Sequence, residues 1–226
     1  GTFLRRELFE PLASDARLGT PPEEDGRHAT LYAPGVGERL ARMLATTLLT
    51  PEAPEAILTR DVVKRLSVAR RAFSKPKVPL KEGVLAYNSV AVRRAELGWA
   101  GATASADGVA RAYLPFANAG QHRGTRYLRA ETLTPIYARQ TWSDRDAVLM
   151  KPLGWSQGFL KEQRHVFCPN PESFGHAGMG GALGWADPVA SVAFGYTMNR
   201  MDWRVRSPRV LALCRTLYEC EALRDG

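Results

Sequence analysis

The sequence lacks long hydrophobic runs and blocks of like charge. No apolar stretch approaches the roughly 18 residues that a membrane-spanning helix needs, so no membrane association is predicted. The formal net charge is +8, but the arginines occur singly or in pairs rather than in runs of five or six. No nucleic-acid-binding motif accompanies this charge, so the sequence predicts a basic solvated surface and no nucleic-acid partner.

Cysteine is scarce, and its spacing matches no metal site. The chain contains Cys168, Cys214 and Cys220. An odd number of thiols argues against a disulfide framework and favours a reducing compartment, which makes the cytoplasm the preferred location. Three of the four histidines lie in polar segments without a partner at ligand spacing, so no metal is predicted.

The chain also lacks an initiator Met and a recognisable signal peptide. It opens inside a helical pattern, in which Phe3, Leu4, Leu8 and Leu12 fall near one face. We therefore expect that a natural N-terminal part, and any targeting information in it, is missing from this sequence.

What is present is an ordinary globular composition, with 45% hydrophobic and 24% charged residues. One domain over residues 1–226 is predicted, mainly helical over 1–145, with antiparallel strands and a closing helix over 146–226. Helices are expected at 2–12, 35–50, 51–72 with an interruption at Pro54, 105–117, 130–140 and from 208 onward, and strands at 153–161, 173–185 and 189–201. Helices followed by a strand meander predict an α+β fold with a helix-covered sheet.

The most informative segment is the glycine-rich stretch from Phe174 to Pro188. Glycine weakens a strand, so this density requires a reason, and close approach of a ligand to the backbone is one. His176 could donate a hydrogen bond to such a ligand. The alternative is a bulged strand with a surface histidine.

The pattern His176-x-Gly178-x-Gly180-Gly181, followed by Asp187-Pro188 and a Phe-Gly-Tyr strand, resembles the third active-site motif of β-lactamase-related serine hydrolases. Family VIII carboxylesterases carry a similar pattern, whereas penicillin-binding proteins and β-lactamases carry Lys-Thr-Gly there. The segments 2–12, 102–120 and 153–159 also resemble the family, so the likeness covers nearly the whole chain.

The resemblance implies a β-lactamase/transpeptidase-like fold and an acyl-enzyme mechanism without metal or organic cofactor. It implies that the glycine-rich strand lines one wall of the site and supplies oxyanion-binding amides. The wall residues would be His176, Gly178, Met179, Gly180 and Gly181. Trp155 and Phe159 are further candidates for the pocket, although core packing is the more common role of such side chains.

The family's nucleophile, a serine in Ser-x-x-Lys on a buried helix, lies upstream of the helix with which this chain begins. Ser74-x-x-Lys77 fits the letters, but Pro76 between them would break the helix that must hold both side chains on adjacent turns. Tyr87 and Asn88 resemble the family's Tyr-x-Asn motif only superficially. No residue of this chain is therefore predicted to be the nucleophile.

These observations predict the C-terminal part of a serine hydrolase that acts on small carboxylic esters, or alternatively on β-lactams or amides, and that is inactive by itself. A non-catalytic protein built on the same fold is the other hypothesis. Because strands from both chain ends form the family's sheet, the isolated chain would expose a sheet edge and associate with itself.

Overall fold

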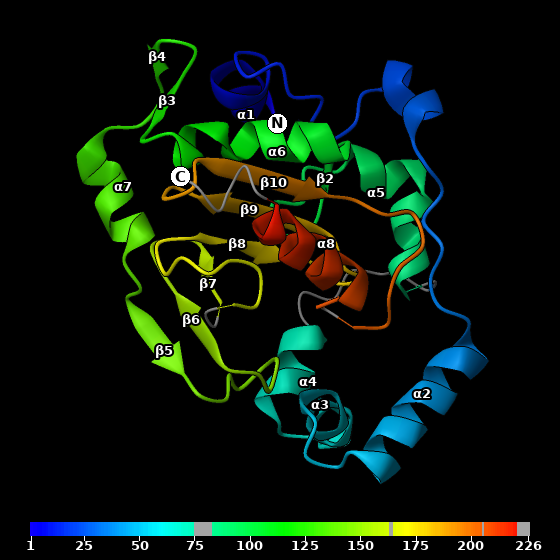
Figure 1. The fold of residues 1–226 in the computed structure, drawn as a ribbon. Helices are drawn as coiled ribbons and strands as arrows, with labels where there is room; N and C mark the ends of the chain where they lie inside the picture. Colours follow the sequence, from blue (N-terminus) through cyan, green and yellow to red (C-terminus); the bar gives the residue numbers. More distant parts are fainter. Residues whose placement is uncertain (75–82, 163–164, 205, 221–226) are drawn as a thin grey trace.

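The computed structural model describes residues 1–226 except 75–82, 163–164, 205 and 221–226. Its centre is an antiparallel sheet with the strand order β10-β9-β8-β7-β6-β5 (Figure 1). The strands are β5 (Thr141–Ser143), β6 (Leu153–Trp155), β7 (Leu160–Lys161), β8 (Phe174–Ala177), β9 (Leu183–Asp187) and β10 (Val192–Tyr196). Neighbouring strands of the sheet follow one another along the chain, as the predicted meander requires.

Helices cover both faces of this sheet. On one face, α6 (Ala106–Ala117) and α7 (Ala130–Tyr137) pack against a core that contains Phe174 and Ala186. On the other face, α8 (Pro208–Glu219) contributes Val210 and Cys214 to a second core (Figure 1). The helix–sheet–helix layering confirms the predicted α+β class.

Helix α6 lies directly on the backbone of β10. A Cβ atom at Gly195 would stand 2.2 Å from the Ala106 carbonyl oxygen and 2.7 Å from the Ala110 nitrogen. Only glycine allows such an approach. Ser105 caps this helix by accepting a hydrogen bond from the Gly108 amide at 3.0 Å, which explains why the helix starts where the sequence predicts.

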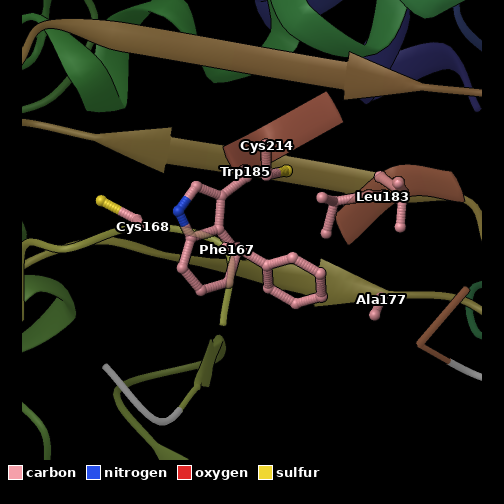
Figure 2. Close-up of a cluster of buried hydrophobic side chains, with 7 residues drawn as sticks. Phe167, Cys168, Ala177, Leu183, Trp185 and Cys214 are labelled. Atoms are coloured by element: carbon pink, nitrogen blue, oxygen red, sulfur yellow. The ribbon is translucent and has the colours of Figure 1, made fainter. Parts of the chain in front are cut away.

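The core under α8 combines aromatic packing with one buried carboxylate. Figure 2 shows Trp185 beside Phe167, and their ring centroids are 5.1 Å apart. Asp187 is completely buried, and its Oδ2 accepts hydrogen bonds from Cys168 Sγ, Asn170 Nδ2 and Tyr218 Oη. Its Oδ1 accepts the two following turn amides, at residues 189 and 190, so the carboxylate ties β9, the 167–170 loop and α8 together.

The remaining elements are short or lie outside the sheet layers. The helical ones are α1 (Thr2–Leu4), a π-helix (Arg5–Phe9), 3-10 helices (Pro22–Arg27 and Gly83–Asn88), α2 (Val36–Leu49), α3 (Pro54–Val63), α4 (Val68–Phe73) and α5 (Val90–Arg94). Two small ribbons pair β1 (Arg17–Leu18) with β2 (Ala102–Thr103) and β3 (Gln121–His122) with β4 (Thr125–Arg126). None of the helices in the described part of the chain is long and apolar enough to cross a membrane.

Several element boundaries differ from the predicted ones. The helix expected over 51–72 is divided into α3 and α4, because Ser67 starts a new helix by capping the Arg70 amide. The strand expected over 153–161 is interrupted by a turn in which Gly158 has φ +84°. Strand β5 belongs to the sheet although it lies before residue 145, the predicted border of the strand region.

Candidate functional site

The predicted site residues lie on β8 and on the turn that connects it to β9. His176 is in β8, paired with Gly184 of β9, and residues 178–182 form the turn. The turn is closed by a hydrogen bond from the Gly178 amide to the Ala182 carbonyl at 2.7 Å and one from Gly181 to Gly178 at 3.1 Å. His176 and the backbone of the turn therefore lie next to each other at the end of β8.

Packing and backbone conformation explain two of the three turn glycines. Gly180 has φ +87° and a Cβ there would meet Met201 at 2.6 Å, while Gly181 has φ +106° and a Cβ would meet Ser207 at 2.7 Å. A Cβ at Gly178 would meet only Ala182, at an ordinary 3.5 Å. Packing within the fold therefore does not require a glycine at position 178.

The glycines within the strands have a different cause from the one the sequence suggested. A Cβ at Gly175 would collide with the Gly184 carbonyl oxygen at 2.1 Å, and a Cβ at Gly184 would collide with Tyr113 of α6 at 2.4 Å. Close helix and strand packing thus explains most of the glycine density. Gly178 is the glycine of this segment at which a ligand could approach the backbone.

Two turn amides remain available as hydrogen-bond donors. The Met179 and Gly180 N–H groups donate to no other described residue, whereas those of Gly178 and Gly181 close the turn. The Gly180 carbonyl accepts the Asp202 amide at 2.8 Å, which fixes the plane of the following peptide. The Met179 side chain is 57% exposed, so solvent reaches this part of the turn.

His176 lies beside Trp155 at the surface of the sheet. Their ring centroids are 6.3 Å apart, and Trp155 is 40% exposed. Desolvation by neighbouring atoms lowers the pKa of His176, and a hydrogen bond with the Ala177 backbone opposes this shift. The imidazole is therefore disposed to be neutral near pH 7, and it remains accessible because its residue is exposed.

Phe159, the other pocket candidate, packs into the core instead of beside His176. Its ring centroid is 4.7 Å from that of Phe174 and 5.3 Å from that of Phe116. The structure therefore brings Trp155 to His176 and separates Phe159 from both. The residues that hold the turn from behind, Met201 and Ser207, were not predicted, because nothing in their local sequence marks that contact.

The segments that resemble a nucleophile motif have structural roles where they are described. Ser74 is the C-cap of α4, and its Oγ donates to the Arg71 carbonyl at 3.3 Å, while residues 75–77 lie outside the described residues. Tyr87 stacks edge-on against Trp99 at 6.4 Å. Asn88 makes paired hydrogen bonds with the Leu31 backbone at 2.8 and 2.9 Å, which bind two distant loops together.

The helix–sheet–helix fold and the glycine-rich turn at its centre are those of serine hydrolases related to β-lactamases. A beta-lactamase family model matches residues 1–213, and the chain belongs to the beta-lactamase family. This confirms the family predicted from the His176–Gly181 pattern.

Individual relatives agree with this assignment. The chain is 31% identical over 204 residues to the Esterase/beta-lactamase LipL of Mycobacterium tuberculosis. The aligned region covers 88% of this chain and 42% of LipL. A family VIII carboxylesterase structure matches with TM-score 0.74 and 27% identity over 97% of this chain and 51% of that one. A penicillin-binding protein homologue from Caulobacter crescentus matches with TM-score 0.70 and 27% identity, covering 97% and 52%. The chain thus spans about half the length of these relatives.

Proposed function

We propose that this chain forms the substrate-binding wall of a serine hydrolase that acts on small carboxylic esters. The observation that carries the proposal is the combination of an uncrowded Gly178 with free amides at Met179 and Gly180. An ester carbonyl lying over Gly178 would present its oxygen to these donors. Amides that are already oriented stabilise the negative charge of a tetrahedral intermediate, which is commonly the largest catalytic contribution.

His176 would border this substrate as a neutral hydrogen-bonding group. A lysine at this place would supply a permanent positive charge, which suits substrates with their own carboxylate. Since burial holds the pKa of His176 below its usual value, a neutral ester fits the site better than an anionic β-lactam. Trp155 offers an exposed apolar face next to the imidazole for the acyl or alcohol group.

The nucleophile is proposed to lie outside these 226 residues. Ser74 is unsuited because it lies at the end of a helix, whereas the chemistry needs serine and lysine on successive turns. The named relatives, an esterase/β-lactamase and a family VIII carboxylesterase, support the ester substrate class. Acyl transfer from serine needs no metal, and among the described residues no three His, Cys, Asp or Glu side chains cluster as ligands.

The proposal is tested by kinetics on the product of the complete gene. We expect hydrolysis of p-nitrophenyl butyrate with a kcat/KM far above that for the β-lactam nitrocefin. Gly178→Ala should lower kcat/KM for the ester by about 100-fold, because a methyl group would displace the reacting carbonyl. The matched control is Gly98→Ala, where a Cβ meets nothing within 4 Å.

Retention of full activity in Gly178→Ala would contradict the assignment of this wall. Absence of ester hydrolysis in a folded complete product would favour the other hypothesis, a non-catalytic protein on this fold.

A further inference from the structure

A second polar cavity lies away from His176, next to β7 and the start of β8. Its volume is about 420 Å³, and Lys161, Trp185, Cys168, Ser173 and Arg139 are among its lining residues. None of the predicted site residues lines it. The cavity therefore needs an explanation separate from the proposed ester site.

Lys161 brings a buried positive charge to this cavity. The residue is only 2% exposed, and its Nζ donates one hydrogen bond, to the Tyr137 carbonyl oxygen at 2.6 Å. It forms no ion pair with any described carboxylate. Buried ammonium groups are normally paired, and desolvation lowers the pKa of Lys161 to about 8. Two of its three N–H donors are free to bind another acceptor.

Trp185 contributes a second unused donor. Its side chain is 3% exposed, and its Nε1 is buried without a hydrogen-bond partner among the described residues. Figure 2 shows this nitrogen on the side of the ring that faces Cys168, which also lines the cavity. A buried indole N–H usually finds an acceptor, so this donor is available to a ligand in the cavity.

The acidic groups nearby do not supply that acceptor. The oxygens of Asp187 are already occupied by donors from Cys168, Asn170, Tyr218 and two backbone amides. Glu172 lies on the exposed rim, where its charge raises the pKa of Lys161 without an ion pair, and Arg139 has the opposite effect. Glu162 also lines the cavity, but its side chain, which is 3% exposed, pairs with Arg206. Among the described residues, the Tyr137 carbonyl oxygen is thus the acceptor that Lys161 Nζ meets.

We propose that this cavity binds the carboxylate of a small organic acid, which accepts hydrogen bonds from Lys161 Nζ and Trp185 Nε1. One carboxylate oxygen can pair with the ammonium group while the other takes the indole proton, so both unused donors are satisfied together. The site is separate from the proposed ester site and does not depend on hydrolase activity.

Saturation-transfer NMR on this chain, with propionate as the probe, tests the proposal. This method detects weak ligands and remains usable if the protein associates with itself. We expect a saturable signal from the propionate methyl group. Propionamide, which has the same shape but no charge, should give no saturable signal. Sodium chloride at equal ionic strength should not displace propionate.

Variants then locate the site. Lys161→Met keeps the length of the side chain and removes its charge, and should weaken propionate binding about ten-fold or more, since a charge-assisted hydrogen bond is lost. Trp185→Phe keeps the ring and should weaken binding about three-fold or more, as for a neutral hydrogen bond. Glu172→Gln removes a competing negative charge and should tighten binding. Lys64→Met, at a lysine with an exposed side chain, is the matched control and should bind as the unmodified chain does.

Near-ultraviolet circular dichroism verifies that each variant is folded. If Trp185→Phe fails to fold, Lys161→Met and Glu172→Gln still decide the question because they leave the aromatic core intact. No saturable propionate signal, equal binding of propionamide, displacement by chloride, or unchanged binding in folded Lys161→Met would each overturn the proposal.

Discussion

Two amphipathic helices of this chain show very different surroundings. Helix α6 lies between the N-terminal helical turn and the sheet, and it packs so tightly on β10 that no side chain fits at Gly195. Helix α2 has an equally clear apolar stripe, yet none of its residues is buried. Its apolar side chains Val36, Leu40, Leu44 and Leu48 are 77, 61, 61 and 69% exposed.

These two helices show what an amphipathic pattern specifies. The pattern determines that a helix forms and which of its faces is apolar. It does not determine whether another part of the same chain covers that face. In this chain α6 meets a sheet, whereas α2 packs against α3 and leaves most of its apolar side in solvent. Exposed apolar surface of this kind is typical of an interaction site.

The largest expected effect is on the covered region, at Asp187. Asp187→Ala leaves the donors of Cys168, Asn170 and Tyr218 without an acceptor, so we expect a loss of about 3–5 kcal/mol in the free energy of unfolding. Chemical denaturation followed by circular dichroism measures it. Asp107→Ala is the control, because it removes a carboxylate that is 71% exposed and breaks its ion pair with Arg111. A loss below about 1 kcal/mol at Asp187 would show that the sheet region is not held by this carboxylate.

Glycine-to-alanine changes should have opposite signs in the two regions. Gly195→Ala forces a methyl group against the α6 backbone and should destabilise the chain by about 1–3 kcal/mol. Gly37→Ala in α2, where a Cβ meets nothing within 4 Å, should stabilise it by about 0.4–1 kcal/mol. The same denaturation experiment compares them. Equal signs would remove the contrast between a covered and an uncovered helix.

We propose that the chain associates with copies of itself through the apolar face of α2 and the outer edge of β10, which is an end strand of the sheet. Sedimentation velocity should show species larger than a monomer at micromolar concentration. Leu40→Gln with Leu44→Gln should shift the distribution toward monomer, and any association that remains would be assigned to the β10 edge. A monodisperse monomer of the unmodified chain would refute this proposal.

The smallest expected effect concerns His176, at the border of the covered region. Because burial holds its folded-state pKa below the unfolded value of about 6.5, the unfolded chain binds this proton more readily. The contribution of His176 to stability is therefore complete above pH 6.5 and declines as the pH falls through the folded-state pKa. Melting temperatures at pH 7.5 and pH 5 should differ less in His176→Gln than in the unmodified chain. An identical difference would mean that His176 is not desolvated.

The sequence predicted elements with strong local signals. The caps at Ser105 and Ser207 predicted the starts of α6 and α8, and the structure confirms both. Strand β5 was missed because three residues carry too little periodicity to predict a strand. The division between α3 and α4 was missed because Ser67 lies within a continuous helical pattern.

Prediction of the candidate site was limited in the same way. The sequence placed His176 on a strand, as observed, but it put Gly178 on the same strand over 173–185, whereas residues 178–182 form a turn between β8 and β9. It could not separate glycines required by packing from one left open, because Met201, Ser207 and Tyr113 come from distant segments. The cavity with Lys161 and Trp185 gave no sequence signal, since its two donors meet only through the tertiary fold.

In the proposed arrangement, this chain carries one wall of a serine hydrolase site, and the nucleophilic serine lies outside it. Labelling with a fluorophosphonate probe, followed by mass spectrometry of the peptides, tests it most directly on the chain alone and on the product of its complete gene. We predict no labelled serine within residues 1–226 in either sample, and one labelled serine elsewhere in the complete product. Labelling at Ser74, or no labelling of a folded complete product, would contradict the account.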